Sequence, residues 1–146
     1  MKRQNRFLIC AILVLSLSIS CSQGVRHSGI PAGAQTVLDT ATADLDAGRY
    51  EKLYHEAADE WRSDTTLDES KATFQRLREK LGKASVRNLQ TAREEQTGTA
   101  PVPGHSLIVI YQTTFEHGDG METFTLIERS GKWYLARYFV SSTALQ

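Results

Sequence analysis

Cysteine is scarce in this chain. Cys10 and Cys21 are its two cysteines, and both precede residue 22. The rest of the sequence therefore has no disulfide, no thiol nucleophile and no cysteine-based metal site. This excludes disulfide-stapled domains and thiol enzymes, and it makes the position of Cys21 worth explaining.

The chain also lacks an excess of charge of either sign. It has 17 Lys and Arg residues against 17 Asp and Glu residues. A nucleic-acid-binding domain would show a basic excess clustered on one face, so nucleic acid is excluded as a partner. The spacings typical of a nucleophile elbow, a phosphate loop or a metalloprotease are absent from the sequence.

No hydrophobic run is long enough to span a membrane comfortably. The run Phe7–Leu17 falls short of the about 20 residues that a spanning helix needs. It follows three basic residues and precedes Ser18-Ile19-Ser20, a small-x-small end. This three-part pattern predicts a secretory signal peptide over residues 1–20. Its removal leaves 14 basic residues against 17 acidic ones, a net charge of −3.

Cys21 follows the small-x-small end directly. This arrangement resembles a bacterial lipoprotein signal, in which the cysteine becomes the first residue and carries acyl chains such as palmitate. The sequence departs from that pattern at Ser18, where such signals usually have Leu, and an ordinary signal peptidase could also cut after Ser20. Ser22 resembles the residue of lipoproteins sent to the outer membrane. The resemblance implies a membrane anchor on Cys21, with the protein facing the periplasm.

Residues 21–33 predict a lipidated cysteine followed by a flexible tether, since Gly and Ser dominate without periodicity. Residues 34–146 predict one domain that begins with three helices. The first spans about residues 34–47, and the second runs from Arg49 past Trp61. The third follows the Thr66–Glu69 capping-box pattern and ends near Leu81.

The second half of the domain predicts an antiparallel sheet of about four strands. Its strong runs are rich in β-branched and aromatic residues. A weaker candidate precedes them, in which the three-residue spacing of Val86 and Leu89 predicts a bulge or bend. The predicted strands cover 86–94, 107–115, 121–129 and 133–140, with turns at 117–120 and at Ser130-Gly131.

Both faces of this sheet are apolar over part of their length. In the last strand, alternation places Leu135 and Phe139 opposite Tyr138 and Val140. A second apolar face indicates that the sheet curls around a helix, packs on a partner or lines a cavity. Arg137 fits a polar spot on the concave side or a charge at the sheet edge with its stem packed.

Three helices followed by a curved antiparallel sheet resemble the nuclear-transport-factor-2-like superfamily, a cone-shaped, cystatin-like α+β fold shared with ketosteroid isomerase. The resemblance is carried by residues 45–50, Leu81-Gly82, residues 122–126 and residues 131–135. It implies a cone that serves enzymes, binders and scaffolds alike, so it does not identify an activity. It also implies that dimers formed through the sheet face are common.

The candidate chemistry is sparse. His55, His105 and His117 do not supply the three or four ligands of a zinc site, so we expect no metal and no cofactor. By analogy with the isomerase relatives, Glu122 would be the base, with Tyr111 and Tyr138 as donors. Glu122 opens a strand beside a glycine turn, where a solvated carboxylate is the ordinary expectation.

The favoured interpretation is therefore a lipid-anchored, non-catalytic interaction or structural module of the cell envelope. Its partner would be a second copy of the chain or another envelope protein. The alternative is a binder of a small apolar or amphipathic molecule inside the cone. The residues singled out for a pocket or interface are Tyr54, Trp61, Tyr111, Glu122, Arg137 and Tyr138.

Overall fold

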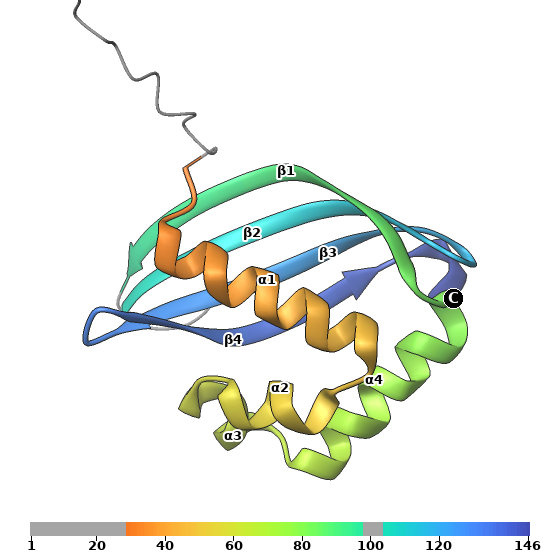
Figure 1. Cartoon of the computed structure of the whole chain (residues 1–146), viewed down its shortest axis with the longest axis horizontal. Helices are drawn as coiled ribbons and strands as arrows, with labels where there is room; N and C mark the ends of the chain where they lie inside the picture. The colour runs from red at the N-terminus through yellow and green to blue at the C-terminus, as the bar shows by residue number, and fades with distance from the viewer. Residues whose placement is uncertain (1–28, 98–103) are drawn as a thin grey trace, which may run out of the picture.

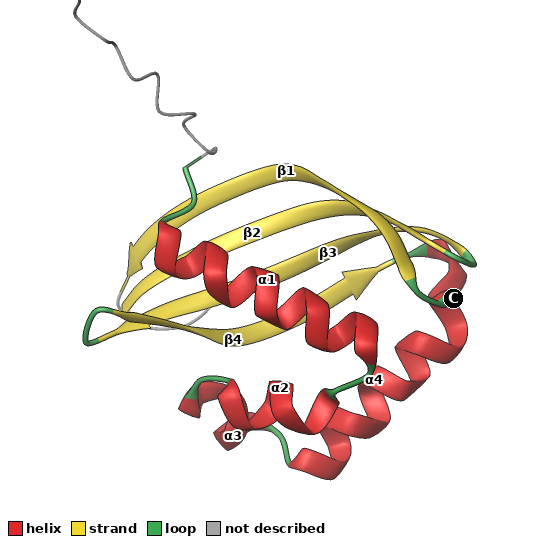
Figure 2. Cartoon of the chain, in the orientation of Figure 1, coloured by secondary structure: helices red, strands yellow, loops and turns green. Residues whose placement is uncertain are grey.

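The computed structural model describes residues 29–97 and 104–146. The predicted signal peptide, Cys21 and most of the tether lie outside these residues. Helices come first and strands follow, so the α+β class is confirmed (Figure 2). The elements are α1 (Ala32–Ala47), α2 (Tyr50–Glu56), α3 (Asp59–Asp64), α4 (Leu67–Leu81), β1 (Ala84–Thr97), β2 (Gly104–Phe115), β3 (Gly118–Arg129), β4 (Lys132–Ser141) and the 3-10 turn η1 (Thr143–Leu145).

The strands form one antiparallel sheet in the order β1-β2-β3-β4. Figure 1 shows this sheet strongly curved, with α1 across its concave side, α2 and α3 beyond the β4 edge, and α4 running from there to the start of β1. None of the helices in the described part of the chain has the length and apolar composition required to span a membrane.

The hydrophobic core lies between α1 and the concave side of the sheet, called the inner face here. Leu38 of α1 packs with Val109, Phe124 and Leu126, which are buried and come from the two central strands. Because side chains alternate along a strand, their sequence neighbours lie on the opposite, outer face. The curved sheet thus buries one apolar face on helices and presents the other outward.

Two helix ends follow the predicted signals. Gly48 closes α1 in the left-handed region, at φ 71°, which glycine adopts without steric cost. Thr66 and Glu69 form the predicted capping box: the Glu69 N–H donates to Thr66 Oγ1, and the Thr66 N–H donates to the Glu69 carboxylate. The C-terminal end of α1 and the N-terminal end of α4 are therefore fixed by local sequence.

The predicted second helix is wrong as a continuous element. Ala57 and Ala58 are extended, with ψ of 164° and 157°, and they separate α2 from α3. The Ala58 N–H donates to the Leu135 carbonyl oxygen of β4, 2.8 Å away. A hydrogen bond to the sheet replaces one turn of helix, and no helical periodicity in the sequence could show it.

The predicted alternation in β4 is also wrong. Leu126 pairs with Leu135 while Thr125 pairs with Arg137, so Ala136 is an extra residue in the strand. Such a bulge shifts every later side chain to the other face. As a result Leu135 and Tyr138 both contact the core, whereas Phe139 is 64% exposed.

The turns are tight. Ser130 and Gly131, with φ of 51° and 77°, make the predicted two-residue hairpin between β3 and β4. The preceding turn is shorter than expected, because β3 begins at Gly118 rather than at Met121. β1 has the predicted irregularity, with register shifts at Ala84/Val86 and Leu89/Thr91.

Candidate functional site

Glu122 is the centre of the polar network inside the sheet. Its side chain on β3 points to the inner face and is fully buried, which contradicts the expectation of a solvated carboxylate. Its Oε2 accepts hydrogen bonds from Thr113 Oγ1 and Arg87 Nε, both at 2.6 Å. Its Oε1 accepts one from the Tyr138 hydroxyl at 2.6 Å and a longer one from Arg87 Nη2 at 3.4 Å. The carboxylate is thus held from three strands.

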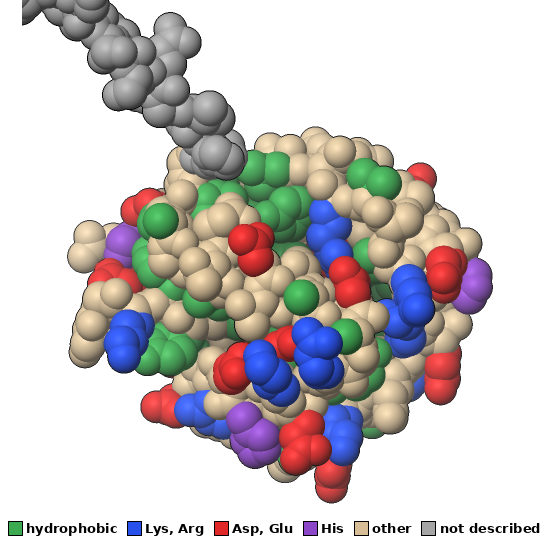
Figure 3. Space-filling view, in the orientation of Figure 1, with side chains coloured by type: hydrophobic (Ala, Val, Ile, Leu, Met, Phe, Trp, Pro, Cys, Tyr) green, Lys and Arg blue, Asp and Glu red, His purple; other side chains and the backbone are tan. Residues whose placement is uncertain are grey.

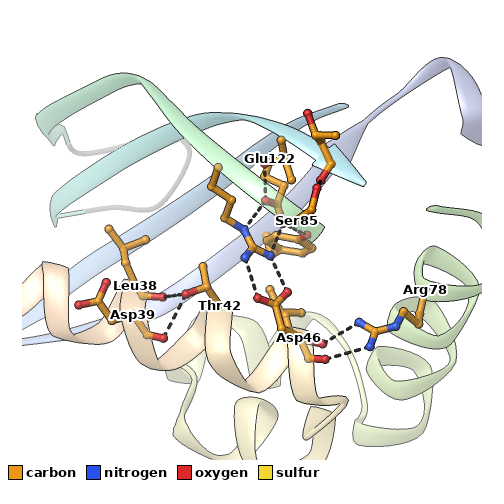
Figure 4. Close-up of polar contacts among 12 residues, drawn as sticks. Leu38, Asp39, Thr42, Asp46, Arg78, Ser85 and Glu122 are labelled. Atoms are coloured by element: carbon orange, nitrogen blue, oxygen red, sulfur yellow. Dashed lines mark hydrogen bonds and ion pairs between the residues drawn. The ribbon is translucent and has the colours of Figure 1, made fainter. Parts of the chain in front are cut away.

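Arg87 links this carboxylate to the helices. Its two terminal nitrogens donate to the Asp46 carboxylate in the last turn of α1, at 2.8 and 2.9 Å. Figure 4 shows Glu122 and Asp46 pointing toward one another, with a guanidinium between them. Arg78 of α4 in turn donates to the Asp46 carbonyl oxygen at 2.9 Å. The Glu122–Arg87–Asp46 network therefore joins β1, β3 and two helices.

The protonation states follow from this geometry. Burial lowers the pKa of Arg87, but hydrogen bonds to Asp46 and Glu122 outweigh it, so the pKa is raised overall. Burial raises the pKa of the Tyr138 hydroxyl well above its usual value, and the Glu122 charge adds to that effect. Both side chains are therefore protonated donors to Glu122 near neutral pH.

The space around the network is small. A cavity of about 40 Å³ lies between the C-terminal end of α1, α4 and the sheet, with Glu122, Arg87 and Tyr138 in its wall. That volume suffices for a few water molecules, at roughly 10–15 Å³ each. Every buried side-chain nitrogen or oxygen in the described residues has a hydrogen-bond partner. The network is therefore satisfied without a ligand.

The predicted site residues do not converge on one place. Tyr111 pairs with Glu122 in register, but its ring packs edge-on against Phe124 at a centroid distance of 5.9 Å. Its hydroxyl makes no hydrogen bond to Glu122 within the described structure. Of the two tyrosines proposed as donors, the structure brings only Tyr138 to the carboxylate.

Trp61 and Arg137 line a second site, which we call the β4 groove. It is an open groove of about 390 Å³ between α3, α4 and β4, and Tyr138 also contributes to its wall. Arg137 lies at the rim, 54% exposed, and its Nη2 contacts Asp64 at 3.3 Å. The edge interpretation of Arg137 is thus the right one. Tyr54 lies nearby, and its hydroxyl donates to the Thr65 carbonyl oxygen.

Sequence reasoning missed Arg87, Thr113 and Asp46. Arg87 lies two residues before Leu89, which packs against the core, so the two side chains share a face of the bulged strand. This spacing is the one signal that could have predicted an inward-pointing Arg87. Asp46 looks like an ordinary polar residue at a helix end. Their contact joins residues 41 positions apart, which no local pattern shows.

The histidines among the described residues do not gather into a metal site. His105 contacts Glu94 through Nε2 and Glu128 through Nδ1, at 2.9 and 2.8 Å, so the carboxylates lie on opposite sides of the ring. His55 is exposed beside Glu51. No group of three or more potential metal ligands is found in residues 29–97 and 104–146.

Comparison with known proteins places the chain in a family without an assigned activity. Residues 37–138 match the family described as a protein of unknown function, DUF4019. The match begins within α1 and ends within β4, so it covers the Glu122 network and all of the β4 groove except Phe139. No curated protein matches the chain. The chain belongs to the DUF4019 family.

Proposed function

We propose that the chain is a lipid-anchored protein of the cell envelope that acts as a non-catalytic interaction module. The observation that carries this proposal is the saturated carboxylate of Glu122. A general base needs a free lone pair within reach of a substrate proton. Here both carboxylate oxygens accept hydrogen bonds from protein donors, and the adjoining cavity has about 40 Å³.

The interior also offers little to a small ligand. Ligand pockets usually have volumes of roughly 300–1,000 Å³. The cavity beside Glu122 is far smaller, and its polar groups already bind one another. We therefore favour the outer surface of the domain, rather than its interior, as the site that binds a partner.

A nuclear-transport-factor-2-like cone is consistent with this role. The sheet curves around α1, and bulges in β1 and β4 supply the bends that such curvature needs (Figure 1). The cone assignment rests on this curvature together with the resemblance in sequence.

The outer face of the sheet is the proposed interaction surface, and its occupant is a second copy of the chain. Ile110, Thr123 and Phe139 lie side by side across three strands of this face, next to Met121. Phe139 is 64% and Met121 37% exposed. No charged residue belongs to this central row, while the adjacent row ends in an arginine on β1 and another on β4. Two copies related by a two-fold axis through the central row would therefore bring uncharged side chains together at its centre.

The helical side differs in character. Figure 3 shows acidic and basic side chains mixed over the helices. Asp44 of α1, for example, contacts both Arg49 and Lys52 at 2.7 and 2.8 Å. These charges neutralise one another locally, so this side lacks the single-sign field that would select a charged partner.

The lipid anchor is tested by the variant Cys21→Ala in the full-length chain. We expect the wild type to fractionate with membranes and to show the added mass of acyl chains, and the variant to be released into the soluble periplasmic fraction. The matched control, Ser22→Ala, should keep the acyl mass. A wild type without acyl mass, or a variant that still fractionates with membranes, would contradict the anchor.

A further inference from the structure

The β4 groove is bordered by the free edge of a strand, a feature that a small-molecule pocket does not require. Its wall on the sheet side consists of four consecutive residues, Ala136 to Phe139. The three residues after the bulge at Ala136 point to alternate faces, so a groove that touches all of them runs along the strand's edge. β4 is the last strand in the sheet order, and that edge has no strand beside it.

The opposite wall is one face of a helix. Ser70, Thr73, Phe74 and Leu77 of α4 line the groove, at the spacing of neighbours on a helix surface. They extend over about 10 Å, at about 1.5 Å per residue. The four strand residues also cover about 10 Å, at about 3.3 Å per step. Each wall is therefore long enough to contact a few residues of extended chain.

The protein itself uses this edge once. The extended residues Ala57 and Ala58 approach β4, and the Ala58 N–H donates to the Leu135 carbonyl oxygen. Within the described residues this is the one backbone hydrogen bond that reaches β4 from outside the sheet. The groove begins at the next residue, Ala136, so the edge continues into it without a partner strand.

The other edge of the sheet is built differently. Besides the inward-facing Arg87, β1 has three charged side chains, Arg93, Glu94 and Glu95. Charges on an edge strand are a common protection against the addition of another strand. From Ala136 to Ser141, β4 has one, Arg137, and its partner Asp64 also lines the groove, so the two charges cancel.

We propose that the β4 groove binds an extended, uncharged peptide segment of another protein, which adds to the sheet as a fifth strand beside β4. The peptide backbone would pair with the β4 edge, and every second side chain would pack on Trp61, Phe74 and Leu77. The exposed Arg137–Asp64 pair crosses the rim, and because such pairs contribute little to stability it gives way readily. This surface shares Phe139 with the outer face assigned to self-association, but its helical wall is separate, so a variant of that wall tests the groove alone.

The test uses the purified full-length chain and a displayed library of random peptides of about ten residues, longer than the groove at about 3.3 Å per residue. Thr73→Trp fills the groove from an exposed position of α4 without removing a core side chain. Gln75→Trp, on another face of the same helix, is the matched control. We expect selected peptides with alternating apolar residues whose binding weakens by about tenfold or more in Thr73→Trp, and not in Gln75→Trp.

Backbone pairing is then tested by N-methylation of each residue of a selected peptide in turn. In strand addition only every second N–H faces the partner strand, so methylation at alternate positions should abolish binding and methylation between them should not. Hydrogen exchange of β4 from Ala136 to Ser141 should slow when the peptide binds. Three results would overturn the proposal: no selected peptide, binding that Thr73→Trp leaves unchanged, or binding that tolerates methylation everywhere, which would indicate a site for side chains or small molecules alone.

Discussion

At the scale of single residues, the charge of Glu122 is balanced by Arg87 in a buried place, and Asp46 balances the same guanidinium closer to solvent. Glu122 has no exposed side-chain surface, whereas Asp46 is 39% exposed. We expect Glu122→Gln to lower the free energy of unfolding by about 3 kcal/mol, because breaking a buried ion pair leaves a charge uncompensated. Asp46→Asn, the matched variant, should cost about 1 kcal/mol or less.

Urea unfolding of both variants measures this difference. A Glu122→Gln variant as stable as Asp46→Asn would show that the buried Glu122 charge adds no more to the free energy of unfolding than the exposed Asp46 charge. The proposed function survives that outcome. It depends on the Glu122 oxygens being already hydrogen-bonded to protein donors, and not on how much these contacts stabilise the fold.

His105 makes the stability of the domain depend on pH. Hydrogen bonds to Glu128 and Glu94 raise the pKa of His105 above its usual value. The stabilisation is therefore complete below the unfolded-state pKa of about 6.5, and it is lost as pH rises through the folded-state pKa. The same contact lowers the pKa of Glu128, whose contribution is lost at acidic pH instead.

We expect the wild type to lose stability as pH rises above about 6.5, and His105→Gln to remove that slope. Thermal unfolding across neutral pH measures it, with the exposed His55→Gln as control. The same slope in wild type and His105→Gln would assign the pH dependence to other groups.

At the scale of elements, the capping box stabilises the start of α4. Thr66→Ala removes the oxygen that accepts the Glu69 N–H, and we expect a loss of about 1 kcal/mol in the free energy of unfolding. Thr66→Ser should restore most of it, because the hydroxyl is kept. If Thr66→Ala unfolds at the same urea concentration as the wild type, α4 depends on its packing alone.

The elements also show which parts of the fold were predictable from the sequence. α1 ends and α4 begins where Gly48 and Thr66 indicate, since these signals act within a few residues. The break at Ala57–Ala58 and the bulge at Ala136 were not predictable, because each depends on a contact between distant segments. For the same reason Glu122 and Tyr138 could be nominated from the sequence, but their connection through Arg87 to Asp46 could not.

At the scale of the whole molecule, the proposed self-association through the outer face predicts a dimer. We expect native mass spectrometry to show a dimer for the wild type and a monomer for Met121→Glu, since a charge buried beside the central row of an apolar interface lacks a partner. Gln75→Glu, exposed on α4, should remain dimeric. A monomeric wild type would contradict self-association and leave the outer face to a different envelope protein.

The position of β4 has a further consequence for the chain as it is synthesised. α1 is made first among the described elements, yet the strand it contacts most is β4, which is made last of the four. Tyr138, the hydroxyl donor to Glu122, also arrives with β4. A nascent or prematurely terminated chain without β4 would leave one side of α1 uncovered and Glu122 short of a donor. The chain therefore stays protease-sensitive until its last strand has been synthesised and has packed on α1.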